Sequence, residues 1–76
     1  MTELSHESEA RLADRQADRL EAQAADREDR SARWYGGGSH AYVLSMDTAA
    51  RYRAEARALR SRAAYHREQA ARGTKG

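Results

Sequence analysis

Small side chains recur at every seventh position in two separate segments of this chain. They are Ala10, Ala17, Ala24 and Ser31 in the first segment and Ala49, Ala56, Ala63 and Ala70 in the second. Further seam residues fall three places after the small ones and include Ala13, Leu20, Tyr52, Leu59 and His66. Spacings that alternate between three and four residues are typical of a helix with one contact seam. We therefore expect an all-α protein, an antiparallel two-helix hairpin whose backbones approach closely along alanine, as in Alacoil coiled coils.

The chain has few large apolar side chains from which to build a core. Its 76 residues include one Trp, four Tyr and two Met, but no Phe and no Cys. A chain of this size usually needs a disulfide, a metal or a partner subunit to be stable, and the lack of Cys excludes the first of these. We therefore expect one domain that associates into a dimeric four-helix bundle, binds another helical protein, or does both.

Neither a signal peptide nor a membrane span is indicated by the sequence. No apolar run approaches the ~20 residues that cross a bilayer, and the chain contains no Pro that would interrupt a helix. We expect a cytoplasmic protein that does not bind membranes.

Charged rows beside the two seams predict how the helices pair. The residues four places after the small ones are acidic in the first segment and basic in the second, which matches Glu7 with Arg67, Asp14 with Arg60 and Glu21 with Arg53. Exposed pairs contribute only about 0.2–1 kcal/mol each, but a matched row selects orientation and register.

The glycine run Gly36 to Gly38 decides between two registers that differ by seven residues. Glycine supplies the positive φ angles that end helices, and Ser39 is a suitable N-cap for the next helix. This favours helices near 3–33 and 40–72, a turn at 34–39 and a tail at 73–76, with Ala17 opposite Ala56. A later start at Ser45 would favour the slipped register, with Ala17 opposite Ala63 or Ala24 opposite Ala56.

Residues suited to catalysis or metal binding are sparse. In the preferred register His6 approaches His66, and Glu7 or Glu9 could complete a metal site, whereas His40 lies alone at the turn. No two ligands stand four residues apart on one helix with a third converging, so we interpret His66 as a seam-edge residue that reaches water. The three glycines lack the context of a phosphate-binding loop. We predict a protein that is not an enzyme, with no catalytic, cofactor or metal site.

Nucleic-acid binding is the alternative function. Residues 1–33 have a charge balance of −3 and residues 34–76 one of +5, so the second helix is rich in Arg. Because the acidic row already matches one stripe of arginines, the residues left for phosphate contacts are Arg51, Arg57 and Arg72.

The segment 33–42 places Trp34-Tyr35-Gly36 at the expected turn. A Trp-x-Gly turn in a helical hairpin resembles the WXG family, small substrates of type VII secretion systems. That resemblance implies a dimeric four-helix bundle, packing of the turn Trp against the partner, and export without a signal peptide. The chain departs from the family in being short and basic and in having Gln69, not an acid, four residues after Tyr65.

Large apolar side chains that lie off the seam are the expected partner contacts. They have nothing within one hairpin to pack against, and they are Leu12, Trp34, Tyr35, Leu44 and Tyr65. We therefore predict a small, non-catalytic protein-interaction module.

Overall fold

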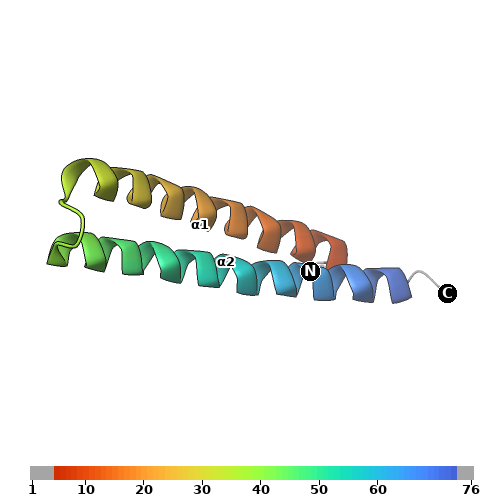
Figure 1. Cartoon of the computed structure of the whole chain (residues 1–76). Coiled ribbons are helices and arrows are strands. Elements are labelled where there is room, and N and C mark those ends of the chain that lie inside the picture. Colours follow the sequence, from red (N-terminus) through yellow and green to blue (C-terminus); the bar gives the residue numbers. More distant parts are fainter. Residues whose placement is uncertain (1–4, 74–76) are drawn as a thin grey trace.

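The computed structural model describes residues 5–73 and contains two long antiparallel α-helices joined by a short turn (Figure 1). Helix α1 spans His6–Trp34 and helix α2 spans His40–Gly73. The molecule is a rod with principal extents of 58 × 20 × 16 Å. The expected all-α hairpin is thereby confirmed.

Helix α1 begins three residues later than the sequence suggested. Ser5 has extended backbone angles (φ −70°, ψ 162°), and its side-chain oxygen accepts a hydrogen bond from the Ser8 amide at 3.1 Å. A serine hydroxyl in this position satisfies one of the amides that the first helical turn leaves without a partner. The N-cap at Ser5 therefore sets the start of the helix.

Of the three turn glycines, which we expected to supply positive φ angles, only Gly38 has one. Helix α1 ends at extended Tyr35 (φ −116°, ψ 144°), whose amide donates to the Ser31 carbonyl at 3.0 Å. Gly38 alone among residues 5–73 has a positive φ, of 84°. It is the third residue of a tight turn that the Ser39 amide closes on the Gly36 carbonyl at 3.1 Å. A positive φ at that place is the feature of type II turns that favours glycine.

Ser39 caps the second helix. Its hydroxyl accepts a hydrogen bond from the Tyr42 amide at 3.1 Å, and its carbonyl accepts one from the Val43 amide at 3.0 Å. Helix α2 therefore starts at His40, directly after the glycine turn, and not after Ser45.

The interface between the helices is built from the predicted small residues. Among residues 5–73 the buried side chains are Ala10, Ala13, Ala17, Ala24, Ser31, Ala49, Ala56 and Ala63. No fully buried side chain in this range is larger than that of Ser31. The seam residues Leu20, Tyr52, Leu59, His66 and Ala70 are half-buried at its edge. The two helices therefore approach closely and enclose little apolar volume.

The packing also identifies the register. Ala63 clusters with Ala10 and Ala13, and the Ser31 and Ser45 hydroxyls share a hydrogen bond of 2.6 Å near the turn. Carried along both helices, this offset places Ala17 level with Ala56. The slipped register would instead bring Ala17 to Ala63.

Substituting Gly38 should weaken the hairpin more than substituting its neighbour. We expect Gly38→Ala to lower the free energy of unfolding by about 1 kcal/mol, because an L side chain is strained at φ 84° even though a Cβ meets no atom there. Gly37 is equally open and has no positive φ, so Gly37→Ala should be neutral or slightly stabilising. Urea unfolding followed by circular dichroism measures both, and equal losses would contradict this assignment of the turn.

Candidate interaction surface

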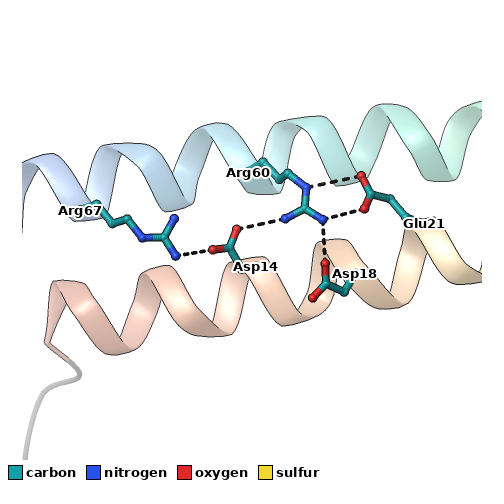
Figure 2. A network of polar contacts seen from close by, with 5 residues as sticks. All are labelled: Asp14, Asp18, Glu21, Arg60 and Arg67. Atoms are coloured by element: carbon teal, nitrogen blue, oxygen red, sulfur yellow. Dashed lines mark hydrogen bonds and ion pairs between the residues drawn. The ribbon is translucent and has the colours of Figure 1, made fainter.

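One broad side of the hairpin carries an interhelical network of charges, shown in Figure 2. The Arg60 guanidinium lies at its centre and contacts Glu21 at 2.6 Å, Asp18 at 2.7 Å and Asp14 at 3.3 Å. Arg67 bonds the other oxygen of Asp14. Nearer the turn, Arg53 holds both oxygens of Glu28, at 2.5 and 3.1 Å. We call this side, with its acidic row on α1 and arginine row on α2, the charged face.

Two of the three predicted ion pairs are replaced by other pairs in this network. Asp14 does contact Arg60, but Arg67 bonds Asp14 in place of Glu7, and Arg53 bonds Glu28 in place of Glu21. Helical side chains lean toward the N-terminus of their own helix. In an antiparallel pair this tilt brings each arginine toward the acid one heptad nearer the turn. Positions of the Cα atoms alone therefore predict the wrong acid for Arg67 and Arg53.

The network shifts the ionisation of its acids. The Arg67 hydrogen bond lowers the pKa of Asp14, the Arg60 hydrogen bond lowers that of Glu21, and the Arg53 hydrogen bond lowers that of Glu28. The hydrogen bond with Glu21 in turn raises the pKa of Arg60. These groups remain in water, so the network orients the helices more than it stabilises them.

Acid should weaken the hairpin through these carboxylates. The pKa of Glu21 is lower in the folded state than its unfolded value of 4.5. The stabilisation that Glu21 contributes is therefore complete above pH 4.5 and is lost as the pH falls from there through the folded pKa. We expect Arg60→Gln to reduce this acid-dependent loss, because Arg60 is the main cause of the Glu21 shift. The control is Arg57→Gln, which removes the same charge. Because Arg57 forms no ion pair within residues 5–73, this variant should keep the wild-type pH dependence. Thermal unfolding across the acid range tests this; identical pH profiles for wild type and Arg60→Gln would contradict it.

The opposite side of the hairpin carries neutral, apolar and charged side chains together. At about 100° per residue, the positions two, three and six places after each small residue fall on one side of a helix, and the position four places after falls on the other. The residues directly before the small ones lie on this side, and half of them are neutral: Gln16, Gln23, Thr48 and Gln69. The other half are charged: Glu9, Arg30, Glu55 and Arg62. The acidic and arginine rows that pair with each other meet across the charged face, so these mixed rows share the other side.

Apolar side chains gather on this second side, which we call the apolar face. It comprises Leu12, Leu20, Leu44, Tyr52, Leu59 and Tyr65. Leu12, Leu44 and Tyr65 are 43%, 55% and 56% exposed. Leu12 and Tyr65 both lie toward the open end, whereas Leu44 lies near the turn. Of the five predicted partner residues, the structure thus places three on one face.

Trp34 and Tyr35 occupy the turn end of the hairpin. Trp34 is 77% exposed and lines a shallow groove with Tyr35, Arg27, Arg30 and Ser45. Val43, on the first turn of α2, is also exposed and was not among our expected contacts. The sequence could have indicated Val43 in the same way as Leu44, because both are large apolar residues off the seam.

Arg27 occupies a seam position at which the spacing predicts an apolar residue. Its guanidinium lies 5.9 Å from the centre of the Tyr52 ring, a cation–π contact that covers part of this half-buried tyrosine. Arg27 therefore places a charge within the apolar face, beside Tyr52.

The arginines expected to contact phosphates in the alternative function lie apart from one another, and two of the three form ion pairs. Arg51 pairs with Asp47 at 3.2 Å and Arg72 with Glu68 at 3.4 Å, each on its own helix. We expected Arg51 and Arg72 to be free for phosphate contacts, whereas each pairs with an acid on its own helix. Arg57 forms no ion pair within the range 5–73.

The histidines that the register predicts to meet do so at the open end. The Nδ1 atoms of His6 and His66 lie 2.8 Å apart, and one ligand atom each from His6, Glu9 and His66 lies within 4.8 Å of the other two. His40 is exposed at the opposite end of the rod.

Neither described helix contains a stretch that is apolar and long enough to cross a bilayer. Comparison of this chain with protein-family models, with curated proteins and with solved structures finds no match.

Proposed function

We propose that this hairpin is a non-catalytic protein-interaction module that docks its apolar face on a helical partner, in the first instance a second copy of itself. The main supporting observation is that the fold buries small side chains and leaves large apolar ones exposed. Within residues 5–73 the buried interface holds only Ala and Ser, whereas Leu12, Leu44, Tyr65 and Trp34 are 43–77% exposed. Apolar groups that a fold leaves in water are the ordinary source of binding energy between proteins.

A second copy suits this surface because a two-helix layer has no third element to cover it. Two hairpins packed through their apolar faces form a four-helix bundle, in which the half-buried Leu20, Tyr52 and Leu59 become core. The charged faces would then remain outside, where their ion pairs are already formed. A symmetric dimer is also the commonest assembly of soluble chains.

Trp34 is the proposed anchor at the turn end. Exposed tryptophans with an adjacent groove are frequent hot spots of binding, and Tyr35 extends the same surface. The resemblance of Trp34-Tyr35-Gly36 to the WXG turn supports this role, because the turn Trp of that family packs against the partner. We accordingly propose a WXG-like factor that acts through assembly.

Variants on the apolar face test the proposal. We expect Leu12→Ser with Tyr65→Ser to weaken self-association about tenfold or more, equivalent to ~1.4 kcal/mol. The matched control is Ala22→Ser with Ala54→Ser, because both alanines are exposed and point away from the apolar face. Light scattering coupled to gel filtration gives the mass at each concentration. If both variants associate like wild type, the apolar face is not the contact surface.

Nucleic-acid binding remains the alternative, supported by the +5 balance of residues 34–76. It requires free arginines, whereas Arg53, Arg60 and Arg67 bond acids of α1. Binding to a fluorescent DNA or RNA duplex that falls steeply with salt, and that persists in Trp34→Ala, would favour this alternative.

A further inference from the structure

The open end of the hairpin brings together three metal-ligating side chains from two helices. His6 is the first residue of α1, Glu9 follows one turn later, and His66 comes from α2. The Nδ1 atoms of the two histidines are 2.8 Å apart, and one ligand atom from each residue lies within 4.8 Å of the others. Our expectation of no metal site relied on ligand spacing within one helix, which does not register ligands that converge across the interface.

Glu9 has no competing partner. Within residues 5–73 its carboxylate forms neither an ion pair nor a hydrogen bond. It also lies in the first turn of α1, where its negative charge offsets the positive end of the helix that would otherwise oppose a cation. Glu9 is therefore available as a ligand.

Aromatic contacts hold the two imidazoles. The rings of His6 and His66 lie 5.0 Å apart with a tilt of 31°. The Tyr65 ring meets both nearly edge-on, at 6.5 Å from His6 and 5.4 Å from His66. Ser5 fixes the start of α1 and with it the position of His6. The imidazoles are thus partly oriented before any ligand arrives.

We propose that His6, Glu9 and His66 bind a divalent metal ion of the zinc class at the open end of the hairpin. Two nitrogens and a carboxylate oxygen suit Zn²⁺ and its neighbours Co²⁺ and Ni²⁺ better than Mg²⁺ or Ca²⁺, which prefer oxygen. Tetrahedral ligands at Zn–N distances of 2.0–2.1 Å are separated by roughly 3.3 Å, so the nitrogens, which now share a hydrogen bond of 2.8 Å, need to open by about half an ångström. The imidazole that donates this hydrogen bond has to carry its proton on Nε2 when the ion is bound. Water completes the coordination.

Such an ion would close the hairpin at the end that the turn leaves open. The glycine turn joins the helices after Trp34, whereas His6 and His66 are distant in sequence, so the ion bridges nearly the full chain. A ligand that binds only the folded state raises stability in proportion to its occupancy. In a hairpin with an alanine interface, the ion supplies the staple that a chain without Cys lacks.

The test uses the full chain without a polyhistidine tag. We expect ZnCl₂ to bind with one ion per chain by calorimetry and to raise the melting temperature by several degrees, with reversal by EDTA. Co²⁺ should give the visible absorption of a four-coordinate site. His66→Gln and Glu9→Gln should each weaken binding about tenfold or more, whereas His40→Gln, which removes the histidine at the other end, should leave it unchanged.

Three results would overturn the site. They are an absence of binding, equal binding by wild type and His66→Gln, and a ratio of one ion to two chains, which would indicate ligands from separate hairpins. Both glutamine variants should retain the wild-type helical circular dichroism without metal, so a loss of binding reports the ligands and not unfolding.

Discussion

Replacing Ala56 with leucine should destabilise the hairpin by about 1–3 kcal/mol or abolish the fold. Ala56 is fully buried in the seam between the helices, level with Ala17, which is buried to the same extent. A leucine there needs space that two closely packed backbones do not have, so the helices must separate along their length. The loss is large for a protein of this size because the seam is its main interhelical apolar contact.

Ala54→Leu is the matched control for this substitution. Ala54 lies on the same helix two residues away, is exposed and points away from the apolar face, and alanine and leucine have similar helix propensities. Thermal unfolding by circular dichroism should therefore show a large loss for Ala56→Leu and little change for Ala54→Leu. Equal melting temperatures for the two variants would mean that the alanine seam does not form.

A disulfide between positions 31 and 45 should form spontaneously in air and stabilise the chain. The Ser31 and Ser45 hydroxyl oxygens are 2.6 Å apart, and cysteine places a sulfur where serine has its oxygen. Closing a loop of about 15 residues is worth roughly 3 kcal/mol through the entropy of the unfolded chain. We expect Ser31→Cys with Ser45→Cys to melt at a higher temperature when oxidised than when reduced.

The same chemistry discriminates between the two registers. In the slipped register residue 31 would lie near residue 52, so Ser31→Cys with Tyr52→Cys would form the intrachain bond instead. Gel mobility with and without reductant, at low protein concentration, separates the two pairs. Efficient closure of the 31–52 pair together with failure of the 31–45 pair would refute the register described above.

The sequence predicts the fold well because the informative patterns are local. The spacing of Ala10, Ala17, Ala24 and Ser31 determines which side of α1 is buried, and Ser39 after the glycines determines where α2 begins. The interhelical salt bridges are less predictable, because the direction in which an arginine leans depends on side-chain geometry that residue spacing does not contain. Arg67 accordingly bonds Asp14 and not Glu7.

The candidate surfaces are predictable only in part. Residue type and seam position identify Leu12, Leu44 and Tyr65 as exposed, but their gathering on one face follows only once the paired charged rows have defined the other face. The cluster of His6, Glu9 and His66 depends on the register and on rotamers. Sequence reasoning found the approach of the two histidines and left open which of Glu7 and Glu9 joins them.

We propose that the hairpin is incomplete alone and pairs through its apolar face. Sedimentation equilibrium of the wild-type chain at micromolar concentration tests this pairing most directly. We expect a mass twice that of the 8.5 kDa chain, falling toward the single-chain value on dilution. A folded, fully helical protein that stays at the single-chain mass at every concentration would contradict self-assembly as the function of this face.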